Sequence, residues 1–312
     1  MQIFQDTKID FLGQRKLAMV LSIIMFVVSI GSLVTRGLNL GIDFTGGTLI
    51  ELGYSQAADL PAVRSTLAGK GYDEAVVQNI GTAREVLVRV PPQAGKNSAE
   101  VSNEIHGALA QASGQKIELR RVEFVGPQVG NELVEDGGLA MLYALIGILI
   151  YVAIRFEYRM ATGAIIAAIH DPVLIFGMFS LFQWEFDLTV LAAVLAVIGY
   201  SLNDTIVVFD RIRENFRKMR KATPVEVVNG SINQTLSRTI LTSGTTMLVV
   251  LALFFFGGDM IHGFAIALIL GIVVGTYSSI YVASATALAL GVNKQNLMPV
   301  QKEGEENPEQ MQ

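Results

Sequence analysis

The chain has 312 residues, of which 51% are hydrophobic and only 16% are charged, against about 25% charged residues in an average soluble domain. With a mean hydropathy of +0.48, this composition argues against an ordinary soluble enzyme. The net charge of −5 argues against a nucleic-acid-binding protein, which would carry a basic face, and the lack of cysteine excludes disulfides, thiolate metal sites and thiol nucleophiles.

The first apolar segment, Leu17–Thr35, follows an N-terminal arm (residues 1–16) that carries Lys8, Arg15 and Lys16. Its length falls within the roughly 17–25 residues that a helix needs to cross a bilayer. It is too long and too late for a signal peptide, and no small-residue cleavage site follows it. We therefore expect it to remain in the protein as a membrane anchor.

Residues 36–136 are predicted to form a small α+β domain with linkers, because apolar and alternating runs there are interleaved with two stretches of helical spacing. Ser98 is the expected N-cap of the second helix. The order β-α-β-β-α-β is typical of a ferredoxin-like sandwich. The predicted elements are a strand at 48–52, a helix at 59–68, strands at 75–80 and 85–90, a helix at 98–110 and a strand at 116–125.

Five further apolar segments fill residues 137–290, and in a bilayer they must be helices because every backbone polar group there has to be paired internally. A basic loop, 210–238, is predicted between the fourth and fifth spans of the chain. The tail, 291–312, is acidic and polar, and we expect it to be disordered. The five predicted spans are Gly137–Ile154, Ala161–Phe182, Leu188–Phe209, Thr239–Gly258 and Gly263–Leu290.

Lysine and arginine placement predicts the orientation of these spans. Basic residues lie in the arm, after the second span, in the loop 210–238 and in the tail, whereas the short connections Gln183–Asp187 and Asp259–His262 contain no lysine or arginine. The positive-inside rule then places both termini in the cytoplasm. Domain 36–136 is expected on the opposite, periplasmic side.

The six predicted spans contain only two carboxylates, Asp171 and Asp204. An ionisable side chain at membrane depth costs several kcal/mol unless it is paired or hydrated, so both mark candidate functional positions. Asp204 lies about 8 Å from the inner end of its span at about 1.5 Å per residue. Tyr200, Asn203 and Thr205 surround it in sequence and are placed to form hydrogen bonds across the bundle.

A carboxylate held in hydrocarbon favours its protonated form, which is what a proton carrier needs. The alternative is that Asp204 only pairs with a neighbouring helix and holds the bundle together. Asp171 follows His170 and precedes Pro172, which frees a backbone carbonyl one turn earlier. Asp171 is therefore open to a functional or a structural interpretation.

Arg238 stands directly before the fifth span. It is either a snorkelling anchor on the cytoplasmic side or a partner of Asp204 that couples protonation to helix movement. Small hydroxyl residues such as Thr239 and Thr242 follow it, and they permit close helix packing or line a hydrated path; packing is the favoured interpretation. Gly271-x-x-x-Gly275 in the last span is a helix-contact motif.

The sequence contains no P-loop, no G-x-G-x-x-G, no H-E-x-x-H and no G-x-S-x-G motif. We therefore predict that the chain is not an enzyme, and we expect no cofactor and no metal. Without a nucleotide site, the energy source would be an ion gradient or a partner protein.

Several ordered motifs resemble the SecD/SecF family of bacterial protein-export membrane proteins, on its SecF side. The resemblance covers residues 9–290. It implies a resistance–nodulation–division type architecture, to which SecF supplies six spans and SecD another six with a larger outer domain. The motifs are Gly41-Ile42-Asp43-Phe44-Thr45-Gly46-Gly47-Thr48 and those at 125–130, 199–215 and 231–239.

The resemblance also implies a function: with SecD, such a subunit uses the proton (or sodium) motive force to promote late export of preproteins across the inner membrane. The family's ion-passage residues map onto Asp204 and Arg238. Its glycine-rich motif maps onto Gly41, Gly46 and Gly47, with Asp43 between them, at the turn from the membrane to the outer domain.

The partners implied by the resemblance are SecD, the SecYEG channel, YajC, unfolded preproteins and the lipid bilayer, with YidC as a further candidate and no nucleic acid. Two alternatives stay open at this point. One is half of a small-molecule exporter of similar architecture. The other is a purely structural subunit that stabilises the translocon.

Overall fold

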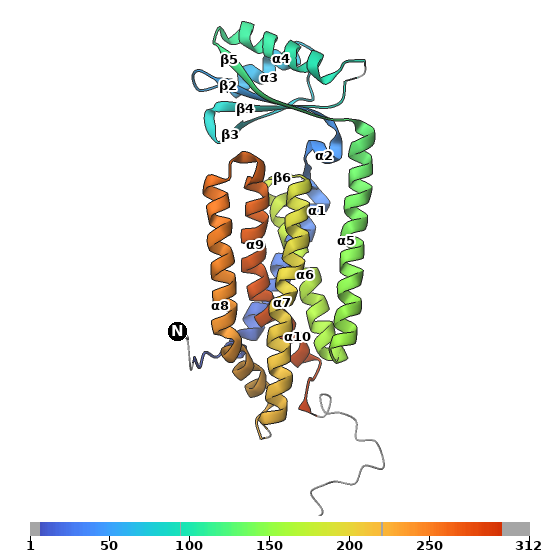
Figure 1. Cartoon of the computed structure of the whole chain (residues 1–312), viewed down its shortest axis with the longest axis vertical. Coiled ribbons are helices and arrows are strands. Elements are labelled where there is room, and N and C mark those ends of the chain that lie inside the picture. The colour runs from blue at the N-terminus through green and yellow to red at the C-terminus, as the bar shows by residue number, and fades with distance from the viewer. Residues whose placement is uncertain (1–6, 94, 220, 295–312) are drawn as a thin grey trace, which may run out of the picture.

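The computed structural model describes residues 7–93, 95–219 and 221–294, and it has two parts, a bundle of long helices and a small sheet domain stacked on one end of it (Figure 1). The N-terminal end of the described chain lies at the other end of the bundle. Six helices among the described residues are long and apolar enough to span a membrane, as the sequence predicts. The protein is thus a multi-pass membrane protein with a separate α+β domain.

The bundle helices extend past the predicted spans, because a helix that leaves hydrocarbon can continue through polar residues of good helical propensity. The expected loop 210–238 is largely helical, since one helix continues to Lys218 and the next begins at Pro224. The second span begins ten residues before Gly137, so the end of the predicted domain 36–136 is helical too. The bundle helices are α1 (Arg15–Arg36), α5 (Pro127–Arg155), α6 (Tyr158–Phe182), α7 (Leu188–Lys218), α8 (Pro224–Phe256), α9 (His262–Ser278) and α10 (Ser284–Ala289).

The sheet domain has the predicted ferredoxin-like order, and its four antiparallel strands lie in the order β3-β4-β2-β5. Asp59 caps α3 as an acceptor from the Ala62 backbone N–H. The N-cap of α4 is Asn97, not Ser98, and it forms a capping box with Glu100. The elements are β2 (Gly47–Tyr54), α3 (Leu60–Ala68), β3 (Val76–Ile80), β4 (Thr82–Val90), α4 (Ser98–Ser113) and β5 (Ile117–Val125).

Alternation along the strands gives this domain its own hydrophobic core. Ile50 and Leu52 of β2 and Val86 and Val88 of β4 are fully buried and pack with Ile105 of α4. The register of β2 against β5 shifts between Glu51 and Leu52, which accounts for the break in the alternation of residues 116–125. The domain therefore has a core independent of the helical bundle.

A short junction joins the sheet domain to the bundle. After α1, the two-residue strand β1 (Asn39–Leu40) pairs in parallel with β6 (Glu185–Phe186), which lies between α6 and α7. The turn α2 (Ile42–Thr45) follows, and then Gly46 and Gly47. Gly47 has a φ of 119°, and a Cβ there would lie 2.4 Å from the Val90 carbonyl oxygen, so only glycine fits.

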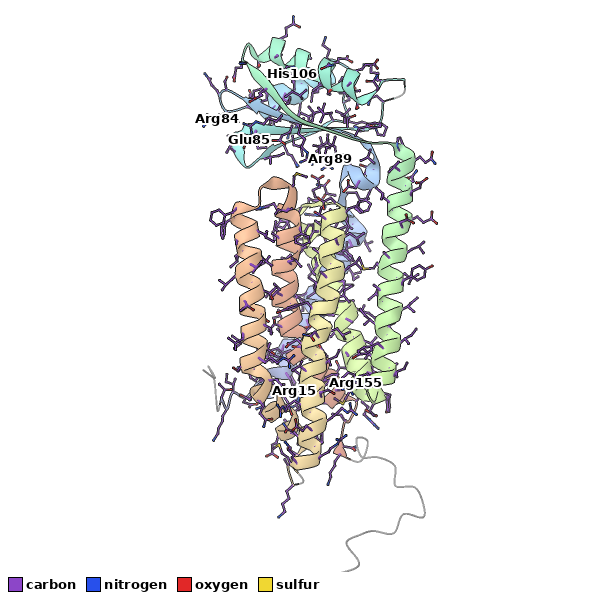
Figure 2. All side chains as sticks on the ribbon, in the orientation of Figure 1. Arg15, Arg84, Glu85, Arg89, His106 and Arg155 are labelled. Carbon is purple, nitrogen blue, oxygen red and sulfur yellow. The ribbon has the colours of Figure 1, made fainter. Side chains whose placement is uncertain are left out.

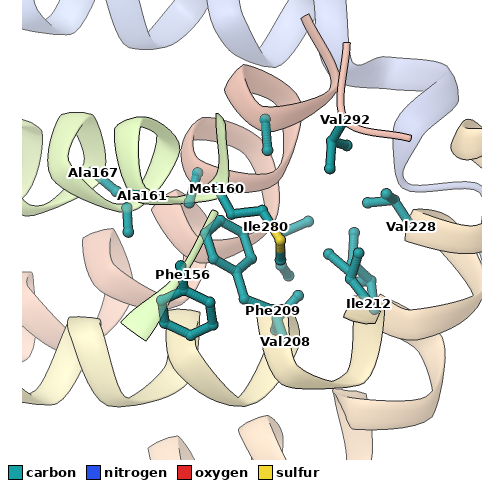
Figure 3. Packing of buried hydrophobic residues seen from close by; sticks show 14 of the residues in the cluster. Phe156, Met160, Ala161, Ala167, Val208, Phe209, Ile212, Val228, Ile280 and Val292 are labelled. Carbon is teal, nitrogen blue, oxygen red and sulfur yellow. The ribbon is translucent and has the colours of Figure 1, made fainter. Parts of the chain in front are cut away.

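The end of the bundle farther from the sheet domain holds a large apolar cluster (Figure 3). Phe156, between α5 and α6, packs edge-on against Phe209 of α7, with ring centroids 5.6 Å apart. Met160, Ile212 and Ile280 are buried around this pair of rings. By contrast, α5 and α8 are mostly exposed along their apolar segments. The helix α1 also exposes many large apolar side chains, so all three helices present apolar surface to the surroundings.

The Gly271-x-x-x-Gly275 motif lies where α9 packs on α7. A Cβ on Gly271 would lie 2.0 Å from Val197 Cγ2, and one on Gly275 would lie 2.9 Å from Ser201 Cβ. We expect Gly271→Ala to destabilise the protein by about 1–3 kcal/mol through overpacking. Thermal unfolding in detergent would measure this, and adding Val197→Ala should restore part of the loss.

Gly244→Ala on α8 is the matched control, because a Cβ there would meet no atom within 4 Å. That variant should unfold at or above the wild-type temperature, since alanine has the higher helix propensity. Equal stability of the Gly271→Ala variant and the wild type would contradict the close contact between α7 and α9.

Candidate functional site

Asp204 lies on α7, half-buried, in the middle of a cluster of hydroxyl groups from two other helices. Thr239 of α8 donates a hydrogen bond from Oγ1 to Asp204 Oδ1 at 2.6 Å. Ser279, which directly follows α9, donates from Oγ to Oδ2 at 2.7 Å. Each carboxylate oxygen therefore has a hydrogen-bond donor, and Asp204 has no ion-pair partner among the described residues.

Asp171, on α6, is completely buried. Its Oδ2 accepts hydrogen bonds from Ser201 Oγ of α7 at 2.5 Å and from Ser278 Oγ of α9 at 2.7 Å. His170 Nδ1 lies 2.9 Å from Asp171 Oδ1, and its ring stacks on Phe26 of α1. Asp171 thus links α6, α7 and α9 through one side chain.

The two carboxylates belong to one set of connected elements. Ser278 and Ser279 are consecutive residues, and Ser201 and Asp204 are neighbours across one turn of α7. A π-helical turn, Ser279–Ala283, begins at the second serine, and such turns occur frequently at functional sites. We call this set of side chains the two-aspartate network; it comprises Asp171, Ser201, Asp204, Thr239, Ser278 and Ser279.

The residues near Asp204 in the sequence, and the hydroxyl residues of α8, differ in their burial and in their hydrogen-bond partners. Tyr200 donates a hydrogen bond to Ser243 Oγ at 3.2 Å rather than to Asp204. Asn203 is exposed and Thr205 is buried, and the side chain of neither makes a hydrogen bond with another described residue. Thr242 bonds the backbone of its own helix. Of the predicted supporting residues, Thr239 is the one that donates a side-chain hydrogen bond to Asp204 in the described part of the chain.

Arg238 does not pair with Asp204. Its side chain is exposed and makes no hydrogen bond or ion pair with any residue in the described part of the chain. The physical reason is helix geometry, because consecutive residues point about 100° apart around a helix axis. With Thr239 directed at Asp204, its neighbour Arg238 must face away from it.

Ser278 and Ser279 are not among the predicted site residues, although each donates a hydrogen bond to a carboxylate. A usable signal was present, since Thr276, Tyr277, Ser278 and Ser279 form a run of four hydroxyl residues in an otherwise apolar helix. Such a run in a membrane span needs partners, and buried carboxylates on other spans are the natural acceptors.

The predicted glycine-rich turn lies at the junction, far along the chain from the two-aspartate network. Gly41 donates from its backbone N–H to the Phe186 carbonyl at 2.8 Å. Asp43 Oδ2 accepts from the backbone N–H of Leu188 at 3.0 Å, which caps the start of α7. Gly46 lies so close to the start of α5 that a Cβ there would sit 3.1 Å from Pro127 Cα.

Comparison with known proteins places the chain in a family. Residues 105–293 match the family described as "Protein export membrane protein SecD/SecF, C-terminal", and residues 31–58 match the "SecD/SecF GG Motif". The chain is 58% identical to protein translocase subunit SecF of Vibrio alginolyticus, with 98% of each chain covered. It is 54% identical to the SecF subunit of Pseudomonas aeruginosa, covering 94% of this chain and 95% of that one.

A solved structure agrees with these sequence matches. SecDF of Thermus thermophilus, described as a translocon-associated membrane protein, superposes with a TM-score of 0.82 at 40% identity. The alignment covers 91% of this chain but only 39% of the SecDF chain, so this chain corresponds to a part of that longer protein. The chain therefore belongs to the SecD/SecF family of protein-export membrane proteins, among its SecF subunits.

Proposed function

We propose that this chain is an accessory subunit of the Sec protein translocase, which works with SecD and uses an ion gradient to promote late export of preproteins across the inner membrane. The translocase names of its relatives support this assignment over a small-molecule exporter. The observation that carries the ion-coupled mechanism is the two-aspartate network, since buried carboxylates in a membrane bundle mark ion pathways.

In this proposal, Asp204 takes up and releases the coupling ion. While ionised, it accepts hydrogen bonds from Thr239 and Ser279 and so draws α8 and α9 toward α7. Protonation removes the charge that makes these hydrogen bonds strong, and the helices can then separate. One proton crossing about 100 mV supplies roughly 2.3 kcal/mol, which is enough to bias such a step.

Arg238 and Asp171 have separate proposed roles. A rotation of α8 about its own axis would bring Arg238 toward Asp204 in place of Thr239, and the pair would then form and break during transport. Asp171 holds α6, α7 and α9 together, so that movement at Asp204 displaces helices as units.

The proposed orientation follows the basic residues of the sequence, with the arm and the α7–α8 turn in the cytoplasm and the sheet domain in the periplasm. The exposed apolar faces of α5 and α8 suit a covering of lipid or of the spans of SecD. The SecYEG channel, YajC, YidC and unfolded preproteins are proposed partners that rest on the family resemblance.

The test uses inner-membrane vesicles that hold the chain with SecD, the channel and a preprotein arrested late in export. We expect a proton or sodium gradient to raise the rate of completion only when this chain is present. Separate proton and sodium gradients identify the coupling ion. An unchanged completion rate with either gradient would refute ion coupling and leave the structural role as a translocon stabiliser.

A further inference from the structure

A buried arginine connects the sheet domain to the bundle. Arg89 lies on β4, on the side of the sheet that faces the helices, and is only 8% exposed (Figure 2). Its Nη1 donates to the Leu40 carbonyl of β1 at 3.0 Å. Its Nη2 lies 2.5 Å from Glu185 Oε2, in the segment between α6 and α7. One side chain of the sheet domain thus contacts both short strands of the junction.

The acidic partner is held as firmly as the arginine. Glu185 belongs to β6, which pairs with β1, and Phe186 accepts a hydrogen bond from the Gly41 backbone. Burial raises the pKa of the Glu185 carboxyl, and the carboxylates of Asp187 and Asp43 raise it further, whereas the Arg89 guanidinium lowers it. Among the described residues, Arg89 is therefore the one cation beside a partly buried carboxyl group that has two other acids near it.

This contact stands at the start of the helix that carries Asp204. Asp187 caps α7 as an acceptor from the Val190 backbone N–H at 2.8 Å, and Asp43 accepts from that of Leu188. From Leu188 to Asp204, α7 is one unbroken helix, and sixteen residues span about 24 Å at 1.5 Å per residue. A helix of that kind moves as a unit, so a displacement at Asp204 reaches Glu185.

We propose that Arg89 is a positioning residue for transport, and that its ion pair with Glu185 is the joint through which movement of α7 turns or lifts the sheet domain. This inference rests on the proposed function and adds the route from the ion site to the domain outside the membrane. The ion pair holds the domain in place, because Arg89 is buried and loses its counter-ion when the two charges separate.

The experiment measures ion flux and preprotein export separately in the same vesicles, with the full chain, SecD and the channel. The variants are Arg89→Gln, Glu185→Gln and the double exchange of Arg89→Glu with Glu185→Arg. Each single variant should lower gradient-driven export by about tenfold, within the usual range of coupling between sites, while ion flux continues. The double exchange should recover part of the export.

Arg120→Gln is the matched control, because Arg120 pairs with Glu85 on the exposed part of the same sheet and should leave export unchanged. Export at the wild-type rate in both single variants would contradict the proposed role of the ion pair. Loss of ion flux together with export would contradict it as well. A double exchange no better than the single variants would also overturn it. Failure of the proposed function is distinguishable, since Asp204→Asn would then leave flux and export intact.

Discussion

Replacing Asp204 with asparagine is expected to abolish the part of preprotein export that depends on the ion gradient, while the protein stays folded and bound to its partners. Asparagine has nearly the same shape, and its amide oxygen can still accept from Thr239. It cannot gain or lose a proton, so the step that uses about 2.3 kcal/mol per proton at 100 mV is lost. Completion of export in vesicles, with and without the gradient, gives the measurement.

Asp210→Asn provides the matched control for this experiment. Asp210 lies on the same helix, but its side chain is 41% exposed and pairs with Arg155 at 2.8 Å and with Arg213 at 3.5 Å. Exposed ion pairs of this kind contribute about 0–1 kcal/mol, so the variant should export normally. Gradient-driven export at the wild-type rate in the Asp204→Asn protein would contradict the proposed mechanism.

Replacing Asp171 with alanine should instead damage the protein itself. The change removes the acceptor of Ser201, Ser278 and His170. Ser278 Oγ still reaches the Gly275 carbonyl, but Ser201 Oγ and His170 Nδ1 lose the hydrogen-bond partner that they have in the described part of the chain. We expect a loss of roughly 2–6 kcal/mol in the free energy of unfolding, since each buried polar group left without a partner costs about 1–3 kcal/mol. Thermal unfolding of the full chain in detergent would show it as a lowered Tm.

Substitutions of the two aspartates should therefore have opposite effects on stability and export, and this difference distinguishes a structural role from a functional one. Asp204→Asn should keep the wild-type Tm and lose gradient-driven export, whereas Asp171→Ala should lose stability first. Asp210→Ala serves as the stability control, since only the solvent-accessible ion pairs with Arg155 and Arg213 are lost. An Asp171→Ala protein as stable as the wild type would show that this carboxylate does not hold α6, α7 and α9 together.

Much of the architecture could be predicted from local patterns. The lengths of the apolar segments predicted the six spans. The spacing of apolar residues, alternate in strands and every three or four residues in helices, predicted the β-α-β-β-α-β domain. Both signals depend only on residues that are close together in the sequence. The ends of elements were predicted less well. Hydropathy does not show that α7 and α8 continue into polar sequence, nor that Asn97 rather than Ser98 caps α4.

The candidate site was predicted in part. Asp171 and Asp204 were identified because acidic residues are rare in apolar segments long enough to span a membrane, where few are tolerated. Their partners were mostly missed, because a hydrogen bond between helices depends on where three or four spans meet. Ser279 is seventy-five residues from Asp204 along the chain, and no local pattern relates the two.

By itself, the sequence determined how many apolar spans the chain has, where the small domain is inserted, and which two acids lie within the apolar segments, because composition and periodicity set each of these locally. Only the tertiary structure decided that Thr239, and not Arg238, faces Asp204, and that Arg89 meets Glu185. Packing against neighbouring helices sets the rotation of a helix about its own axis. Consecutive residues point about 100° apart, so a rotation of α8 by that angle would present the Arg238 guanidinium to Asp204 in place of the Thr239 hydroxyl.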